Sequence, residues 1–262
     1  MKTHDQPAAL VTLLLALADD EFVIGYANSE WTGIAPMLEE DIAFSSLAQD
    51  ELGHARLLYQ LASELDGRTP DALAYGRTPD EYCSCLLVER PGSHWAYSVS
   101  RQFLYDTASY VVFEQLQQSS YLPLARAAAA ILREEKYHLL HGRTWLEHLS
   151  HGGTTARQHQ RAAFEALWPD LLGMFAPLPG EAELCAAAIL PVPFASLQQR
   201  WLSQLAPTMH DLAVPFPFVE QAGIWHADVP AVGGHLSQHS TAFIDLYTTI
   251  TSVYRLDPAA SW

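Results

Sequence analysis

The sequence predicts an all-α protein, a four-helix bundle with additional C-terminal helices. Apolar residues recur at helical spacing along most of the 262 residues, and no stretch alternates convincingly as a strand does. The first part of the chain contains two pairs of long helices joined by short breaks, as in a four-helix bundle. Prolines are frequent after residue 176, which indicates a peripheral layer and not a second core. We therefore expect one domain over residues 1–262, with the core bundle at about 8–151 and a helical layer at about 154–255.

Turn residues set the bounds of the four core helices. Thr32–Pro36 ends the first helix, and Asp66-Gly67 ends the second. Pro123 is tolerated in the first turn of the fourth helix, and Gly152-Gly153 follows its end. The expected core helices are Ala8–Trp31, Met37–Leu65, Ser93–Ser119 and Tyr121–Leu149.

The connecting and C-terminal segments are less regular. The expected helices here are a short one around Asp80–Leu87, then Thr154–Phe175, Phe194–Leu212 and His235–Tyr254. Val214–Gly234 is rich in proline and glycine. Leu190–Phe218 combines prolines with aromatic residues, and we expect an exposed apolar patch that binds a partner. The alternative is that these aromatic residues cap the end of the bundle.

The charge of the chain limits its partners. The net charge is −16, and Lys2 and Lys136 are the two lysines. Such a field repels nucleic acid and anionic lipid, so we expect neither as a partner. It also repels a polyanionic substrate such as an acyl-CoA, for which local arginines or a partner subunit must supply positive charge.

The apolar runs, the N-terminus and the cysteines lead us to expect a cytoplasmic protein. No apolar run reaches the length of about 18 residues that a membrane span needs, and the N-terminus does not resemble a signal peptide. Cys83, Cys85 and Cys185 cannot form a disulfide framework and are expected to be reduced thiols.

Each of the four core helices carries one stripe of residues spaced alternately by four and three, which must face the core. The stripes are apolar except near the middle, where each is interrupted by a carboxylate. In the second and fourth helices a histidine follows three residues later. The interrupting residues are Glu21, Glu51 with His54, Asp106, and Glu135 with His138.

These six residues predict a two-metal site. A buried carboxylate must be neutralised, paired or bound to metal, and the stripes contain no lysine or arginine. One acid from each of two helices plus Glu-x-x-His from each of two others is the ligand set of ferritin-like di-iron and di-manganese proteins. The separations match, since Glu51 lies 30 residues after Glu21 and Glu135 lies 29 after Asp106. A bundle that kept these residues but lost the metal is the alternative.

Other polar residues have two interpretations each. Asp50 and Glu134 lie four residues before the two histidines, which suits an outer hydrogen bond to the imidazole or an exposed helix edge. Tyr110 follows Asp106 by one turn and is expected to be a core tyrosine, with a redox-active neighbour as the alternative. The remaining histidines are expected to be solvated, namely His141, His148, His151, His159, His235 and His239.

Several segments between about residues 15 and 170 resemble the phenylacetyl-CoA epoxidase group of bacterial multicomponent oxygenases, above all its C-type subunit. They are Ser29–Trp31 with Ala35-Pro36, Asp50–Arg56, Leu86–Glu89, Arg101–Phe103 with Asp106, Tyr137-His138 and Leu167-Trp168. The resemblance implies a ferritin-like fold and a role in the aerobic degradation of phenylacetic acid. It also implies a complex with a homologous catalytic A-type subunit, which receives electrons from a separate flavin and iron–sulfur reductase.

The ligands of the A-type subunit fall on the same six residues that the stripes indicate. C-type subunits generally resemble structural partners whose metal site has decayed, whereas this chain keeps every ligand position. The resemblance therefore leaves the catalytic status of the chain open. When alone, the chain is expected to form a homodimer.

Three functions follow. The first is a di-iron monooxygenase component, with two iron ions or iron and manganese, that epoxidises phenylacetyl-CoA or a related aromatic acyl-CoA. Its catalytic carboxylates would be Glu21, Glu51, Asp106 and Glu135, which stabilise the oxidised irons. The second is a non-catalytic structural subunit that stabilises the homologous catalytic one. The third is a stand-alone ferritin-like di-metal oxidase.

Overall fold

The computed structural model describes residues 5–235 and 239–259. The chain divides into two compact units. Unit 1 comprises residues 1–91, 178–180 and 235–262, and unit 2 comprises residues 92–177 and 181–234. About 70% of the chain is helical, so the predicted all-α fold class is confirmed. The prediction of a single domain stays a prediction.

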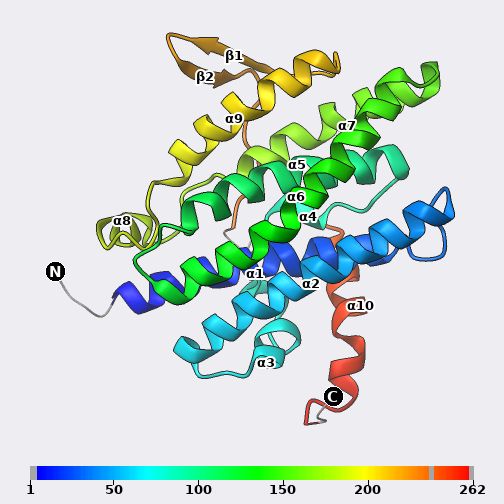
Figure 1. Ribbon diagram of the computed structural model, residues 1–262. Helices are drawn as coiled ribbons and strands as arrows, with labels where there is room; N and C mark the ends of the chain where they lie inside the picture. The colour runs from blue at the N-terminus through cyan, green and yellow to red at the C-terminus, as the bar shows by residue number, and fades with distance from the viewer. Residues whose placement is uncertain (1–4, 236–238, 260–262) are drawn as a thin grey trace. The chain divides into compact units, whose positions relative to one another are not determined.

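Unit 1 is built on a hairpin of two long helices, α1 (Asp5–Ser29) and α2 (Leu38–Asp66), which pack side by side (Figure 1). Shorter elements surround the hairpin, namely α3 (Pro70–Tyr75), the 3-10 turn η1 (Pro79–Glu81), α4 (Leu86–Glu89) and α10 (Phe243–Leu256). Gly67 ends α2 in the left-handed conformation that glycine favours, with its N–H bonded to the carbonyl of Ser63.

Unit 2 repeats this plan with a second hairpin, α5 (Trp95–Leu116) and α6 (Leu122–His151). Helix α7 (Thr154–Gly173) packs on both helices of this hairpin, and α9 (Phe194–Asp211) packs on α5. The remaining elements are α8 (Glu181–Ala186) and the strands β1 (Phe218–Gln221) and β2 (Ile224–Ala227). Each bound of the four long helices lies within three residues of its predicted position.

Four sequence-based expectations about local structure are wrong. The connection between α2 and α5 contains three short helical elements instead of one, because Pro70 and Pro79 each begin a new turn. Helix α8 was not expected. The last helix begins at Phe243 and not at His235, and residues 236–238 of that expected helix lie outside the described part of the chain.

The fourth concerns strands. Residues 218–227 form an antiparallel hairpin, with Phe218 opposite Ala227 and Gln221 opposite Ile224. Its two-residue loop, Ala222-Gly223, has φ of 52° and 79°, as a type I′ turn requires. Alanine is unusual in that turn, where asparagine or aspartate is the usual signal.

The predicted aromatic patch at Leu190–Phe218 is not exposed. Phe194, Trp201 and Phe218 are buried, and Phe216 is half-buried. Within unit 2, Trp168 lies 5.7 Å from Phe216 and 5.2 Å from Phe218 between ring centroids, both edge to face. These rings pack against one another within unit 2, so the expectation of an exposed patch is wrong, and the alternative that they cap the end of the bundle stays a prediction.

The four stripes are buried over their central parts, including the carboxylates at their centres, whereas Leu65 near the end of α2 is exposed. Helix α1 is buried on all sides over Leu13–Ile24, because α2 packs on it along its length and α4 on another side. Among the described helices, none combines the length and the apolar character that a membrane span requires.

Gly25 allows α1 and α2 to approach closely at the level of Glu51. A Cβ atom at Gly25 would lie 2.9 Å from the Cβ of Glu51 and 3.1 Å from the carbonyl oxygen of Ala48. Both distances are shorter than normal contacts, and the neighbours belong to a packed helix. The absence of a side chain at Gly25 therefore sets where Glu51 lies relative to α1.

We expect Gly25→Ala to destabilise the protein by about 1–3 kcal/mol through overpacking. Gly53→Ala is the matched control, because Gly53 is exposed on α2 and nothing lies within 4 Å of an added Cβ. This control should stabilise by up to about 1 kcal/mol, the helix propensity of alanine over glycine. The measurement is the urea midpoint of unfolding, and equal gains for both variants would contradict the close approach at Gly25.

Candidate metal centre

Unit 1 brings together three of the six predicted ligands. Glu21 comes from α1, and Glu51 and His54 come from one face of α2. Nδ1 of His54 lies 3.3 Å from Oε2 of Glu21 and 3.4 Å from Oε2 of Glu51. All three side chains are at most 4% exposed, and one ligand atom of each lies within 4.8 Å of the others. We call these residues the unit 1 triad.

Burial, neighbouring charges and hydrogen bonds shift the pKa values within the unit 1 triad. Burial raises the pKa of Glu21 well above its usual value, and the neighbouring charge of Glu51 raises it further. Burial alone would lower the pKa of His54, but its hydrogen bonds to Glu21 and Glu51 outweigh burial and raise the pKa to about 12. The two carboxylates thus need a positive charge beside them, which a proton on His54 or a metal cation supplies.

Unit 2 holds the corresponding three residues, the unit 2 triad. Asp106 comes from α5, and Glu135 and His138 come from one face of α6. All three are at most 1% exposed. Nδ1 of His138 lies 3.7 Å from Oε1 of Glu135, and one ligand atom of Asp106 lies within 4.8 Å of one of His138. The amide of the buried Gln102 donates a hydrogen bond of 2.6 Å to Oδ1 of Asp106, which holds that carboxylate in place.

The donor atoms of both triads suit iron or manganese. Each triad offers two carboxylates and one imidazole, which are the ligands that these metals share in non-haem sites. No thiol takes part. When ionised, the four acids of the two triads carry four negative charges. Two divalent cations balance these charges, whereas one cation does not.

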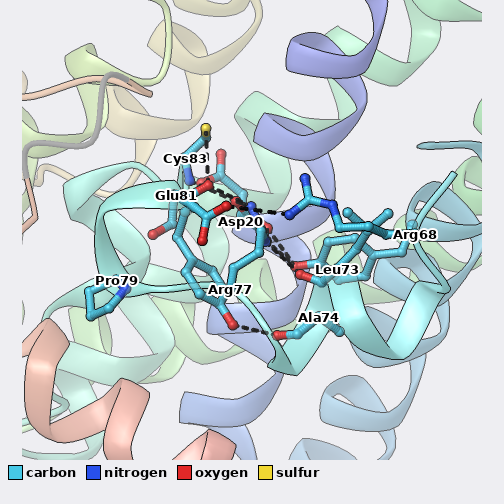
Figure 2. A network of polar contacts seen from close by, with 12 residues as sticks. Asp20, Arg68, Leu73, Ala74, Arg77, Pro79, Glu81 and Cys83 are labelled. Carbon is cyan, nitrogen blue, oxygen red and sulfur yellow. Dashed lines mark hydrogen bonds and ion pairs between the residues drawn. The ribbon is translucent and has the colours of Figure 1, made fainter. Parts of the chain in front are cut away.

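Asp19, two residues before Glu21, is held by the buried Arg77. Figure 2 shows Arg77 within its network of polar contacts, with Leu73 and Cys83 nearby. Both terminal nitrogens of Arg77 donate to the carboxylate of Asp19, as do the hydroxyl of Tyr59 at 2.5 Å and the backbone N–H of Cys83 at 2.7 Å. The side chains of Asp19 and Arg77 are both 0% exposed. Arg77 also donates to the carbonyl of Leu73 and lies over the ring of Tyr82 at 4.0 Å.

Asp20 is held by a histidine from the far end of the chain. Nε2 of His235 lies 2.7 Å from Oδ2 of Asp20, and the backbone N–H of Cys85 donates to Oδ1 at 2.7 Å. Both side chains are 3% exposed. Burial lowers the pKa of His235, but the charge of Asp20 outweighs this and raises it. The carboxylate of Asp20 thus favours the protonated form of His235.

A second histidine fixes the same C-terminal segment. Nδ1 of His239 lies 2.6 Å from Oε1 of the buried Glu89, and its Nε2 lies 2.8 Å from the carbonyl of Pro79. The backbone N–H of Ser240 donates to the other oxygen of Glu89 at 2.6 Å. Both ring nitrogens of His239 thus have a partner, which anchors the ring to η1 and α4. The expectation that His235 and His239 are solvated is therefore wrong.

Comparison with known proteins identifies the family of the chain. The family described as phenylacetic acid catabolic protein matches residues 1–262, the whole chain. The chain belongs to this family.

Two members of the phenylacetic acid catabolic protein family in Escherichia coli (strain K12) are similar to the chain. The C-type subunit of 1,2-phenylacetyl-CoA epoxidase is 35% identical over 160 residues, which are 61% of this chain and 64% of the relative. The A-type subunit of the same enzyme is 28% identical over 207 residues, which are 76% of this chain and 66% of the relative. The matches thus span somewhat less than two thirds of each relative. The resemblance found in the sequence is confirmed.

Sequence reasoning missed the partners of Asp19 and Asp20. Three consecutive acids in the middle of an apolar helix were the available signal, because side chains of consecutive helical residues point in three different directions. Each direction then requires its own counter-charge. The sequence did not reveal which residues supply it, because Arg77 is 58 and His235 is 215 residues away from its partner.

The other predictions have mixed outcomes. Cys83, Cys85 and Cys185 are free thiols as expected. His148, His151 and His159 are exposed as expected, whereas His141 is half-buried. Tyr110 is half-buried and lines a cavity of unit 2. The outer hydrogen bonds of Asp50 and Glu134 stay predictions.

We expect Arg77→Met to destabilise unit 1 by about 3–5 kcal/mol, because it leaves the buried carboxylate of Asp19 without a counter-charge. Arg68→Met is the matched control. Arg68 belongs to the same part of the fold (Figure 2) but is 40% exposed in its pair with Asp66, and pairs of that kind contribute about 1 kcal/mol or less. Urea unfolding compares the two variants, and similar losses would show that the Asp19–Arg77 pair does not stabilise the fold as described.

Proposed function

We propose that this chain is a metal-binding subunit of a multicomponent monooxygenase that epoxidises phenylacetyl-CoA, or a related aromatic acyl-CoA, in phenylacetate catabolism. The observation that carries the proposal is the presence in each unit of a fully buried triad of two acids and one histidine. Family membership supports the pathway, and the names of both relatives support the reaction.

In this proposal the two triads together bind two iron ions, or iron and manganese. The ligands are Glu21, Glu51, His54, Asp106, Glu135 and His138. When bound, such a di-metal centre supplies O₂ activation for the epoxidation of an aromatic ring. The matched separations along the chain support one shared centre, since each hairpin presents its acid and its Glu-x-x-His motif at equal heights.

The residues of the chain have three tasks in this function. The carboxylates and imidazoles hold the ions, and Gln102 orients Asp106 through its hydrogen bond. His54 must give up the proton that it shares with Glu21 and Glu51 when metal binds. The apolar stripe residues above and below the ligands, such as Leu17 and Ile24 on α1, are buried and keep water away.

The partners proposed for the chain are a flavin and iron–sulfur reductase together with a homologous A-type subunit. The two relatives are named as different subunits of one enzyme, which supports a partner of this kind. The net charge of −16 also supports a partner, because the nucleotide of an acyl-CoA needs positive charge that this chain lacks.

A structural subunit without its own turnover is the second candidate. Its support is the higher identity with the C-type relative than with the A-type relative. Metal content separates the candidates, because a purely structural chain has no need of a filled centre.

We expect about two iron ions, or iron plus manganese, per chain in the purified protein, and their loss in the double variant Glu51→Ala, Glu135→Ala. Each replacement removes a ligand from one triad. The matched control is Glu64→Ala, Glu165→Ala, which removes the same charge from exposed positions on α2 and α7. The measurement is metal analysis by mass spectrometry after dialysis against free metal, and full metal content in the ligand variant would refute the assignment.

We expect the chain alone to oxidise phenylacetyl-CoA slowly, and the addition of an A-type subunit with its reductase to raise turnover by orders of magnitude. The physical reason is the electrostatic repulsion of the CoA phosphates. Oxygen consumption and product formation measure the effect. Fast epoxidation by the lone chain with a chemical reductant would exclude the need for a partner.

A further inference from the structure

A cleft of about 380 Å³ lies within unit 1, between α1, α3 and α10. Helix α10 packs on α3 at this place (Figure 1). The volume of the cleft falls at the lower end of the range of small-molecule sites, about 300–1,000 Å³. Three tyrosines, one acid and two hydroxyl residues line it, together with two aliphatic residues. The polar and aromatic members are Tyr26, Tyr75, Tyr254, Asp71, Thr249 and Ser252.

The three tyrosines form the aromatic part of the wall. The rings of Tyr75 and Tyr254 are nearly parallel, with 24° between their planes and 5.8 Å between their centroids. Tyr254 lies against the end of α3, since a Cβ atom at Gly76 would lie 3.3 Å from its hydroxyl oxygen. Tyr26 is half-buried, as are the other two tyrosines, so part of each side chain is open to a ligand. The faces of such rings carry partial negative charge and attract cations.

The cleft also carries a full negative charge. Asp71 is exposed on α3, one turn before Tyr75. Burial raises the pKa of Tyr75, and the charge of Asp71 raises it further, which agrees with a carboxylate close to that ring. Among the described residues that line the cleft, none is a lysine, arginine or histidine. The net charge of −16 adds an attractive field for a cation.

The arginines of this part of unit 1 have partners elsewhere or line another cavity. Arg255 donates to the hydroxyl of Tyr247, and its guanidinium lies over that ring at 4.7 Å. Arg77 is buried in its pair with Asp19. Arg56 lines a neighbouring cavity of about 150 Å³ and not this one. These arginines therefore do not fill the cleft, and its cation must come from outside the chain.

The hydroxyl groups of the cleft are bonded to α10 itself. Oγ1 of Thr249 donates to the carbonyl of Asp245 at 2.9 Å, and Oγ of Ser252 donates to the carbonyl of Thr249 at 2.8 Å. A primary ammonium brings three N–H donors, each of which needs an acceptor when it leaves water. A quaternary ammonium brings none and binds well against aromatic rings. A wall of three rings and one carboxylate therefore suits the quaternary group better.

We infer that this cleft binds a small quaternary ammonium compound, with its alkyl groups against Tyr26, Tyr75 and Tyr254 and its charge beside Asp71. The inference does not rest on the proposed function, because none of these four residues belongs to either triad. The compound would be a ligand of unit 1 in addition to any metal ion or acyl substrate.

Calorimetric titration of the full-length chain with choline tests this inference, with 3,3-dimethylbutan-1-ol as the comparison. The two compounds have the same shape, but the alcohol has a carbon atom in place of the charged nitrogen. We expect choline to bind at one site per chain, and the alcohol to bind at least about tenfold more weakly, equivalent to 1.4 kcal/mol. The amide of Nα-acetyl-lysine, which has a primary ammonium, should also bind more weakly than choline.

Two pairs of variants locate the site. Asp71→Asn should weaken choline binding at least about fivefold, whereas Asp245→Asn, which removes the same charge from an exposed position of α10 outside the cleft, should not. Tyr254→Leu should weaken binding by a similar factor, because it removes a ring from the wall. Tyr254→Phe keeps the ring and should retain binding. The urea midpoint of each variant shows that it is folded.

Four results would overturn the inference. They are no binding of choline to the wild-type chain, equal binding of choline and the uncharged alcohol, tighter binding of the lysine compound than of choline, or unchanged affinity for choline in Asp71→Asn or in folded Tyr254→Leu. The first three use the wild-type chain, so the inference remains testable even where a variant does not fold.

Discussion

The compensation of buried negative charge is the constraint on which the rest of this structure depends. Helix α1 carries Asp19, Asp20 and Glu21 in succession, and all three are at most 2% exposed. Each acid points in a different direction and has a different basic partner, namely Arg77, His235 and His54. The short elements after α2 and the segment before α10 bring the first two of these partners to α1.

The two triads bring further buried acids together, two beside each imidazole. Glu21 and Glu51 have one imidazole between them, and Asp106 and Glu135 have one as well. The pair of divalent cations that we propose would balance the four acids and would account for the polar residues that interrupt four otherwise apolar stripes. The structure also places these residues rigidly, through the close approach at Gly25 and the hydrogen bond from Gln102.

Residue spacing predicted the long helices and the burial of the six candidate ligands because both depend on local periodicity. The burial of Leu14, Phe44, Phe113 and Ile131 follows directly from stripes with steps of three and four. The pairs Asp19–Arg77, Asp20–His235 and Glu89–His239 depend on the path of the chain between distant segments, which periodicity does not encode. The burial of the aromatic residues near Trp201 was not predicted for a related reason. The prolines around them indicate breaks in the helices, but they do not indicate which side chains other elements pack on.

Iron loading followed by spectroscopy distinguishes one shared metal centre from two independent triads. Anaerobic addition of two equivalents of Fe(II) to the metal-free chain, followed by exposure to O₂, is monitored by electron paramagnetic and Mössbauer spectroscopy. A shared centre predicts a spin-coupled diferric pair that is silent in the paramagnetic spectrum. Two independent triads would instead give the signal of isolated high-spin Fe(III), with both irons unpaired, and that result would contradict the account.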